Sequence, residues 1–434
     1  MRVLFLSFGC KVNQVEMQSL REEFERRGAT ACEEDNAPDI CIINTCSVTS
    51  TAETKLRRKV RSLRTKFPHL RIVLIGCYPT RRDAESLALD GVEAVFANRD
   101  KWKALAYFFP DEHDARDWFP ISTSGEHSRA FIKIQDGCDN TCSYCVVRLL
   151  RGAPASRPSE DVIREIRALD EVCVPEIVLS GINLGSWGSD RGEPLSALFR
   201  QIIKARPRAR IRISSVELQQ LTDDLLDVMA DGAGIFCAHL HLPLQSGSDE
   251  ILRAMGRRYT SDEFLARVEA IHRRIDGVGL TTDCITGFPG EGLRQFGESL
   301  RVCRAAGFHR IHAFSYSPRP GTEAYRMTDD VPGDVKRERV AALEELAGAN
   351  CGEFVARLGG KPLEVVFDGD AEPSANREGY SGEYLTVRSG GFAVPGRTLL
   401  RVTGYRYEAD GVELTEPAAP LTSSNSQGPG TSRS

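Results

Sequence analysis

Three cysteines of this chain follow short apolar segments with the composition of buried β-strands. The segments cover residues 2–9, 39–45 and 71–76, and each is followed at once by a cysteine: Cys10, Cys46 and Cys77. Ligand sites in open α/β sheets form beyond the carboxyl ends of the strands. If the three segments are neighbouring strands, their thiols converge at one edge of a sheet, where they can bind an iron–sulfur cluster.

A second set of three cysteines lies within one loop. Cys138, Cys142 and Cys145 have the spacing CxxxCxxC and follow an apolar segment at 131–135. No further Cys or His follows at zinc-finger spacing, which disfavours a structural zinc site. A 4Fe–4S cluster usually takes four cysteines, so three leave one iron open to a small molecule. We therefore expect two clusters, and the alternative for either set is a group of packed core thiols.

The other seven cysteines have no partner at ligand spacing, and we expect them to be packing residues: Cys32, Cys41, Cys173, Cys237, Cys284, Cys303 and Cys351. Residues 3–8 are too short for the apolar part of a signal peptide, and no apolar run is long enough to cross a bilayer. A large chain of this kind with thirteen cysteines indicates a reducing, cytoplasmic location with metal-bound thiolates. The net charge of −5 provides no global attraction for nucleic acid.

The elements that would position these cysteines suggest an α/β protein of about three domains. Residues 1–120 alternate strand and helix and predict an open parallel sheet. Residues 129–358 contain six strand–helix units, which predict a partial (βα)6 barrel with strands at 131–135, 176–180, 210–214, 239–242, 280–286 and 310–316. Residues 359–420 change to a period of two and predict a small OB-like β-barrel with strands at 363–367, 380–387 and 398–405. Residues 421–434 have the composition of a disordered tail.

The central motif resembles that of the radical S-adenosylmethionine (radical SAM) superfamily. The resemblance implies that the open iron binds the methionine part of SAM and that the reduced cluster cleaves it to a 5′-deoxyadenosyl radical. Tyr144 would pack beside this ligand. Small or polar residues at the carboxyl ends of the barrel strands are further candidates for cofactor binding: Gly181, Asn183, Ser214, Glu217 and Gln245.

Longer motifs resemble the methylthiotransferase family over nearly the whole chain, up to about residue 418. They are Gly-Cys-Lys-Val-Asn-Gln at 9–14, Ile-Asn-Thr-Cys-Ser-Val-Thr at 43–49, Gly-Cys-Tyr at 76–78, Lys-Ile-Gln-Asp-Gly-Cys at 133–138 and His-Leu-His-Leu-Pro-Leu-Gln-Ser-Gly-Ser at 239–248. The family architecture is an N-terminal cluster domain, a radical SAM barrel and a C-terminal TRAM domain. The first and fourth motifs are similar to the branch that acts on N6-threonylcarbamoyladenosine, 3′ of the anticodon.

The resemblance implies two 4Fe–4S clusters and two uses of SAM. One SAM methylates a sulfur held at the N-terminal cluster, and the other provides the radical that removes hydrogen from carbon 2 of adenine, where the methylthio group is then attached. The implied partners are a tRNA anticodon stem-loop and a flavodoxin- or ferredoxin-type reductant. A single-stranded loop presents its bases unstacked, as chemistry on a base requires.

Three groups of basic residues are candidate RNA-binding surfaces, because phosphate contacts position a nucleic acid. The first follows Cys46 on a predicted helix at 52–66, and its central members are Lys55, Arg57, Arg58, Lys59 and Arg61. The second is the alternating row Arg206, Arg208, Arg210 and Arg212. The third belongs to the C-terminal barrel and contains Arg397, Arg401 and Arg406.

Three alternatives remain open. One is methylthiolation of isopentenyladenosine in tRNA, and another is methylthiolation of a ribosomal-protein aspartate, against which the basic helix argues. The third, from a different class, is a non-catalytic iron–sulfur protein that binds RNA or carries electrons. An electron carrier would favour four cysteines for each cluster.

Overall fold

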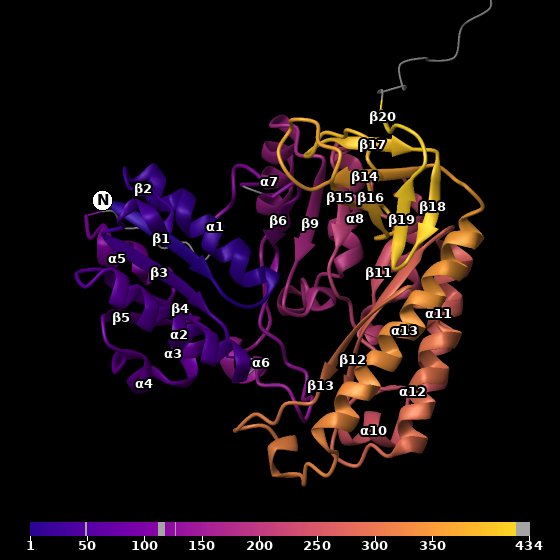
Figure 1. Ribbon diagram of the computed structural model, residues 1–434, viewed down its shortest axis with the longest axis horizontal. Helices are drawn as coiled ribbons and strands as arrows, with labels where there is room; N and C mark the ends of the chain where they lie inside the picture. Colours follow the sequence, from indigo (N-terminus) through magenta and orange to yellow (C-terminus); the bar gives the residue numbers. More distant parts are fainter. Residues whose placement is uncertain (48–49, 112–117, 126, 422–434) are drawn as a thin grey trace, which may run out of the picture.

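The computed structural model describes residues 1–47, 50–111, 118–125 and 127–421. Three sheet regions follow one another along the chain, as Figure 1 shows: an N-terminal sheet on the left, six parallel strands in the centre and right, and a mostly antiparallel sheet at the top. Of the predicted tail at 421–434, all but Leu421 lies outside the described residues, as do Val48 and Thr49 of the second motif.

The N-terminal sheet is parallel, with the strand order β2-β1-β3-β4-β5. Its strands are β1 (Arg2–Ser7), β2 (Thr30–Ala31), β3 (Ile40–Thr45), β4 (Arg71–Gly76) and β5 (Val92–Ala97). The three strands that precede the cysteines, β1, β3 and β4, are adjacent, as predicted. Strands β3 and β4 consist mostly of fully buried residues, because helices cover both faces of the sheet.

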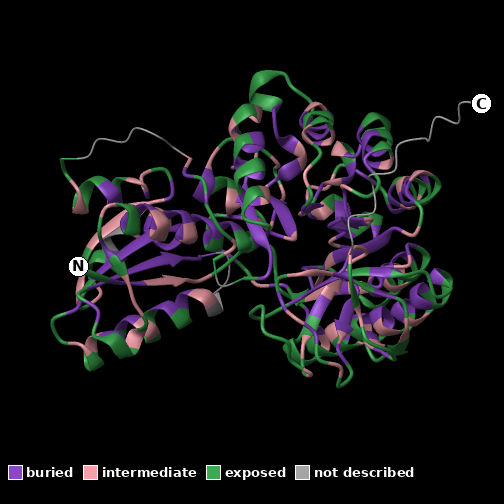
Figure 2. Cartoon of the chain, turned by 90° about the horizontal axis from the view of Figure 1, so that it is seen from above, coloured by how far each residue is buried: buried purple, intermediate pink, exposed green. Residues whose placement is uncertain are grey.

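Two hydrophobic cores lie on opposite faces of this sheet. Helices α1 (Lys11–Arg26) and α5 (Lys103–Phe108) supply one core through Leu20, Phe24 and Leu105. Helix α2 (Ser50–Lys66) supplies the other through Leu56 and Leu63. The short helices α3 (Cys77–Arg81) and α4 (Asp83–Leu87) follow β4. In Figure 2 the buried strands lie between helices whose outer faces are exposed.

The central region is an open parallel barrel made of two three-stranded sheets, and the six predicted strands are present. One sheet contains β6 (Ala130–Lys133), β9 (Glu176–Ser180) and β10 (Arg210–Ile213), and the other contains β11 (His239–His241), β12 (Gly279–Thr286) and β13 (Arg310–Ser315). One bridge, between Ile211 and Phe236, joins the two sheets at β10. Between β6 and β9 the chain forms a small hairpin, β7 (Gln135–Asp136) with β8 (Ala155–Ser156).

Amphipathic helices pack on the outside of this barrel around one large core. The helices expected between the predicted strands are present: α7 (Ser159–Glu171), α8 (Leu195–Ala205), α9 (Asp223–Asp231), α10 (Asp249–Ala254), α11 (Ser261–Arg274) and α12 (Leu293–Ala305). Helix α6 (Val147–Arg151), directly after the second cysteine set, was not predicted. Helix α1 of the N-terminal region contacts the inner face of the sheet that contains β6 and β9, because Val15 packs against Phe131 and Val178.

The long helix α13 (Gly333–Leu358) leads to a curled sheet with the order β18-β19-β16-β15-β14-β17-β20. Its strands are β14 (Leu363–Phe367), β15 (Glu378–Ser381), β16 (Thr386–Arg388), β17 (Leu399–Val402), β18 (Tyr405–Glu408), β19 (Gly411–Leu414) and β20 (Ala419–Pro420). The single strands predicted at 380–387 and 398–405 were wrong, because each contains a turn. Tyr384 has a left-handed φ of 71° in the first turn, between β15 and β16. Gly404 lies between β17 and β18 in the second.

The arginine row at 206–212 is not a continuous RNA-binding surface, which corrects the sequence interpretation. Arg210 and Arg212 are buried on the inner face of β10 and form ion pairs with Glu176. They also donate hydrogen bonds to backbone carbonyls of the C-terminal sheet, including those of Tyr380 (2.8 Å) and Ser381 (2.8 Å). These charges therefore attach the C-terminal sheet to the barrel.

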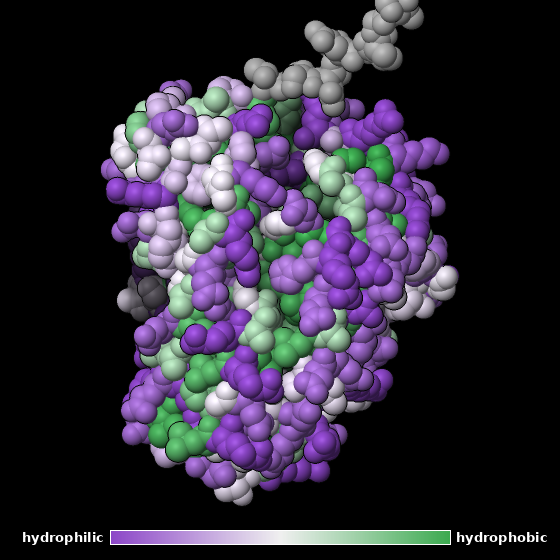
Figure 3. All heavy atoms as spheres, turned by 90° about the vertical axis from the view of Figure 1, so that its right-hand side faces the viewer, coloured by the Kyte–Doolittle hydropathy of each residue, from purple (hydrophilic) through white to green (hydrophobic). Residues whose placement is uncertain are grey.

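No helix in the described parts of the chain is both long enough and apolar enough to span a membrane. Figure 3 shows the face formed by the right-hand side of Figure 1, where hydrophilic side chains cover most of the surface and hydrophobic ones are visible between them.

Candidate active site

The three N-terminal cysteines line one cavity of about 350 Å³. Cys10 precedes helix α1, Cys46 follows β3 and Cys77 begins helix α3. The opposite wall comes from the barrel and includes Ser180, Gly181, Ser214 and Ser215, at the carboxyl ends of β9 and β10. This cavity therefore joins the edge of the N-terminal sheet to the mouth of the barrel.

Glycine is required beside two of these cysteines. Gly9 has φ +119°, and a Cβ there would lie 2.6 Å from the Cβ of Cys46. Gly76 has φ +98°, and a Cβ there would lie 2.4 Å from the side-chain oxygen of Asn44. Both conformations are strained for any residue with a side chain. The two Gly-Cys pairs thus allow the strand ends to approach closely.

Buried amides hold the cysteine segments in place. Asn13 donates hydrogen bonds to the carbonyls of Phe8 and Thr45, each at 3.0 Å, and its Oδ1 lies 3.5 Å from the Sγ of Cys10. Asn98 donates to the Sγ of Cys77 at 3.3 Å and to the Leu150 carbonyl of helix α6 at 3.0 Å. Burial raises the pKa of the Cys77 thiol, so a bound metal must displace its proton. Asn98 lies outside the motifs, and no sequence signal identified it.

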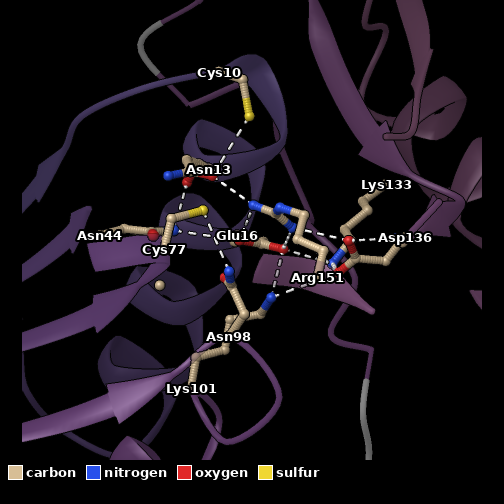
Figure 4. Close-up of polar contacts among 12 residues, drawn as sticks. Cys10, Asn13, Glu16, Asn44, Cys77, Asn98, Lys101, Lys133, Asp136 and Arg151 are labelled. Carbon is tan, nitrogen blue, oxygen red and sulfur yellow. Dashed lines mark hydrogen bonds and ion pairs between the residues drawn. The ribbon is translucent and has the colours of Figure 1, made fainter. Parts of the chain in front are cut away.

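Behind the cysteines, Glu16 is at the centre of a buried charge network (Figure 4). Its carboxylate accepts from Lys101 at 2.7 Å, Lys133 at 2.5 Å and Arg151 at 3.0 Å. Asp136 is a second acceptor for Lys133 and Arg151. Burial disfavours the carboxylate of Glu16, but the three cations outweigh this effect and hold its pKa well below the usual range.

This network connects the two cysteine sets. Arg151 ends helix α6, which follows Cys145, and it donates a 2.6 Å hydrogen bond to Asn13 Oδ1, beside Cys10. The sequence interpretation did not include Glu16, Lys101 or Arg151. Their charge in otherwise apolar surroundings becomes apparent only when the domains are packed together.

The second cysteine set lies in the loop between β7 and α6. Gly137 has φ +74°, and a Cβ there would lie 2.0 Å from the carbonyl oxygen of Ala153. Each thiol accepts a hydrogen bond from nitrogen: from Asn183 Nδ2 to Cys138 (3.7 Å), from Arg257 Nη1 to Cys142 (3.4 Å) and from the Val147 amide to Cys145 (3.4 Å). Donors of this kind stabilise the thiolate form that binds iron.

A second cavity, of about 280 Å³, lies beside this loop. Tyr144, Cys145 and Gln245 line it together with Asp283, Phe314 and Arg319. The predicted cofactor-binding residues are thus divided between two places, because Gly181 and Ser214 line the first cavity. Asn183 contacts Cys138. Glu217 lines neither cavity and forms an ion pair with Arg257.

Several buried polar atoms at the barrel mouth have no hydrogen-bond partner among the described residues: Ser180 Oγ, Ser214 Oγ and Asn183 Oδ1. Buried polar groups are normally paired, so these atoms fit a polar ligand. No three His, Cys, Asp or Glu side chains in the described ranges are close enough to bind a single metal ion. Each cysteine set supplies the thiolate donors that iron–sulfur clusters take in proteins.

The predicted RNA-binding residues occupy two separate regions. Lys55, Arg58 and Arg61 are exposed on α2 and form no ion pair with any described residue. Arg57 and Lys59, on the same helix, pair with Glu85 and Glu34. Arg401 is exposed on β17, and Arg397 precedes that strand and donates to the Gly369 carbonyl. In Figure 1, α2 lies at the left and β17 at the top right, so the fold does not bring the two groups together.

The remaining cysteines are mostly packed, as predicted. Five are buried: Cys41, Cys237, Cys284, Cys303 and Cys351. Cys32 is half-buried, whereas Cys173 is exposed at the end of α7, so its assignment as a packing residue was wrong. All thirteen cysteines lie in the described part of the chain, and none forms a disulfide.

Two family models match the chain. Residues 132–303 match the radical SAM superfamily, and residues 2–97 match uncharacterized protein family UPF0004. Among solved structures, the radical S-adenosylmethionine methyltransferase TsrM of Kitasatospora setae, with cobalamin and a [4Fe-4S] cluster bound, has a TM-score of 0.56 at 13% identity, covering 74% of this chain and 76% of that one. This likeness concerns the fold.

Curated relatives align over most of the chain. The threonylcarbamoyladenosine tRNA methylthiotransferase of Bacillus subtilis is 33% identical over 89% of this chain and 89% of its own. The enzyme of the same name from Thermotoga maritima is 34% identical, over 83% and 85%. The tRNA-2-methylthio-N(6)-dimethylallyladenosine synthase of Desulfitobacterium hafniense is 30% identical, over 90% and 90%. The chain therefore belongs to the radical SAM tRNA methylthiotransferases, transferases that use S-adenosylmethionine and 4Fe–4S clusters.

Proposed function

We propose that this protein transfers a methylthio group to carbon 2 of N6-threonylcarbamoyladenosine, at the tRNA position 3′ of the anticodon. One observation carries the proposal: a single cavity is lined by Cys10, Cys46 and Cys77 on one side and by barrel strand ends on the other. A methylthio transfer needs a sulfur site and a radical site to face one substrate atom. The substrate branch is supported by the Cys-Lys-Val-Asn-Gln motif at 10–14 and by the names of the Bacillus and Thermotoga relatives.

We assign the six cysteines of the two sets as cluster ligands and the polar groups of the barrel mouth as SAM contacts. When bound, the clusters and SAM supply reductive cleavage of a sulfonium and a transferable sulfur, chemistry that no side chain can provide. The protein contributes position and exclusion of water. Asn13 and Asn98 orient the N-terminal cysteine segments, and Arg257 and Asn183 donate to thiols of the second set.

We propose that helix α2 contacts the RNA backbone. It follows the Cys46 segment, and its exposed cations Lys55, Arg58 and Arg61 have no ion pair with described residues. Phosphate contacts beside the cluster cavity would set the position of the anticodon loop, from which the target base must be unstacked. Arg397 and Arg401 would form a second, more distant contact. A flavodoxin- or ferredoxin-type protein in the cytoplasm would supply the electrons.

The test uses anaerobically reconstituted protein, SAM, a reductant and tRNA that contains N6-threonylcarbamoyladenosine without the methylthio group. Nucleoside mass spectrometry should detect the 2-methylthio derivative. The Cys142→Ala variant should be inactive, whereas Cys173→Ala, which changes an exposed cysteine, should retain its iron and activity. Absence of product with wild-type protein that binds its full iron and cleaves SAM would refute the proposed substrate.

A second candidate substrate is isopentenyladenosine in tRNA. The Desulfitobacterium relative, a dimethylallyladenosine synthase by name, covers as much of the chain at only slightly lower identity. The same assay with tRNA that carries this nucleoside decides between the two.

A further inference from the structure

The interior of the barrel carries an excess of positive charge below the cluster cavity. Tyr380 and Tyr384 of the C-terminal sheet are stacked, with ring centroids 5.0 Å apart, and they face three arginines. The guanidinium carbons lie close to the rings: Arg129 4.5 Å from Tyr380, Arg212 4.9 Å and Arg310 5.5 Å from Tyr384. Aromatic faces tolerate cations but do not neutralise them.

Few carboxylates balance these charges. Glu176 pairs with Arg212 at 2.7 Å and Arg210 at 2.6 Å, and it lies 3.8 Å from Arg129. One carboxylate thus serves three arginines. On the opposite sheet, Asp283 is 3.2 Å from His241, whose ring lies 5.8 Å from that of His312. The interior therefore retains positive charge that an anionic group would offset.

Lys11 connects this interior with the cluster cavity. It follows Cys10 and lines the same cavity, and its side chain is exposed. Its Nζ lies 4.9 Å from the centre of the Phe131 ring on β6, and it interacts electrostatically with Glu176, Arg129, Arg212 and Tyr384. Lys11 forms no salt bridge within the described residues, so its three donors are available to a ligand.

The shape of the site restricts the kind of anion. Arg210 and Arg212 of β10 donate to backbone carbonyls of the C-terminal sheet, and Tyr384 stacks on His239 of β11, so this sheet covers the inner end of both barrel sheets. A polynucleotide backbone would have to continue past its phosphate, and the closed end leaves no exit. A short anionic group attached to a base can end there. The carboxylate of an N6-threonylcarbamoyl substituent is such a group.

We propose that Lys11, with the cationic barrel interior behind it, binds the carboxylate of the substrate's N6 substituent and so selects an anionic over an apolar substituent. This inference rests on the proposed function. The ammonium group donates charge-assisted hydrogen bonds to the carboxylate. An isopentenyl group would leave the charge of Lys11 without a partner, and that unfavourable arrangement contributes to specificity.

The test uses reconstituted holoenzyme without reductant and three anticodon stem-loops of identical sequence. Their target nucleotide is N6-threonylcarbamoyladenosine, the same nucleoside with its carboxylate converted to the neutral amide, or unmodified adenosine. Lys11→Gln should weaken binding of the carboxylate RNA about tenfold, the usual effect of one charge-assisted hydrogen bond, and leave the other two RNAs unchanged. Lys11→Arg should restore most of the affinity, and Lys204→Gln, on the exposed side of α8, should change nothing.

The outcomes separate the two proposals. Equal weakening of all three RNAs would assign Lys11 to the phosphate backbone, and weaker binding of SAM in place of weaker RNA binding would assign it to the cofactor. Both results overturn the inference. Iron content equal to wild type shows that the substitution beside Cys10 has not removed the cluster. If Lys11→Gln loses iron, Lys11→Met, which also removes the charge, provides the comparison. If wild-type protein does not discriminate between the carboxylate and amide RNAs and modifies only isopentenyladenosine RNA, the proposed function fails as well.

Discussion

Replacing Glu16 with Gln should destabilise the contact between the N-terminal sheet and the barrel. The substitution keeps the size of the side chain and removes one of the two carboxylates that Lys101, Lys133 and Arg151 share. All four side chains are buried, with exposed fractions of 1% for Glu16, 3% for Lys101, 8% for Lys133 and 2% for Arg151. Asp136 would then be the only carboxylate among the described partners of the three cations.

Removing one partner of a buried ion pair costs about 3–5 kcal/mol, because it leaves an uncompensated charge. That is a large part of the roughly 5–15 kcal/mol that stabilises a typical protein. With a urea dependence of about 2–3 kcal/mol per molar, the midpoint should fall by about 1–2.5 M. Tryptophan fluorescence reports on this region, because the ring centre of Trp118 lies 4.9 Å from the Nζ of Lys133 and the ring centre of Trp102 lies 5.9 Å from the Nζ of Lys101.

The matched control is Glu25→Gln on the same helix. Glu25 is 42% exposed and pairs with Arg21 at 3.4 Å, an arrangement that contributes less than about 0.5 kcal/mol. Its urea midpoint should match that of the wild type. A Glu16→Gln protein within about 1 kcal/mol of wild type would show that the network is electrostatically neutral overall, and would refute the reasoning.

The clusters, a buried histidine and the basic helix each allow a further test. Changing Cys138, Cys142 and Cys145 together to Ala should remove about half of the iron and abolish SAM cleavage. The Cys46→Ala variant should still cleave SAM but should not transfer the methylthio group. Full iron retention in the triple variant would contradict the two-cluster assignment. Burial lowers the pKa of His309 from 6.5 to about 4, so the unfolded chain binds a proton between these values and the folded chain does not. The contribution of this neutral histidine to stability is fully present above pH 6.5, and the free energy of unfolding falls by about 3 kcal/mol as the pH decreases to 4. Urea unfolding at several pH values should show that the free energy of unfolding of His309→Gln depends less steeply on pH than that of the wild type. An unchanged pH dependence would contradict the assignment of this effect to His309. Lys55, Arg58 and Arg61, the exposed cations of α2, can be replaced by Ala one at a time. Each replacement should lower the slope of the logarithm of the tRNA binding constant against the logarithm of the salt concentration by about one unit, because one phosphate is no longer neutralised. A slope equal to that of Lys204→Ala would show that the residue does not contact the RNA.

The sequence alone determined the elements and their order. Six barrel strands and the N-terminal strands before the cysteines were predicted because apolar periodicity and Gly-Cys punctuation are local properties of the chain. The adjacency of β1, β3 and β4 followed from the rule that parallel strands place their carboxyl ends at one edge. The C-terminal strands were predicted less well, because Gly382 and Gly404, which lie in their turns, were each interpreted as part of a continuous strand.

The tertiary structure decided which side chains face one another. Arg210 and Arg212 alternate along the chain as an exposed basic face would, but Glu176 and the carbonyls of the C-terminal sheet lie opposite them. Lys11 and Glu16 both belong to helix α1, yet Lys11 reaches the barrel interior and Glu16 lies in a buried charge network. Periodicity tells which side of an element a residue occupies, whereas the charge and burial of that side depend on partners distant in sequence, and those partners are brought there only by the packing of one domain on another.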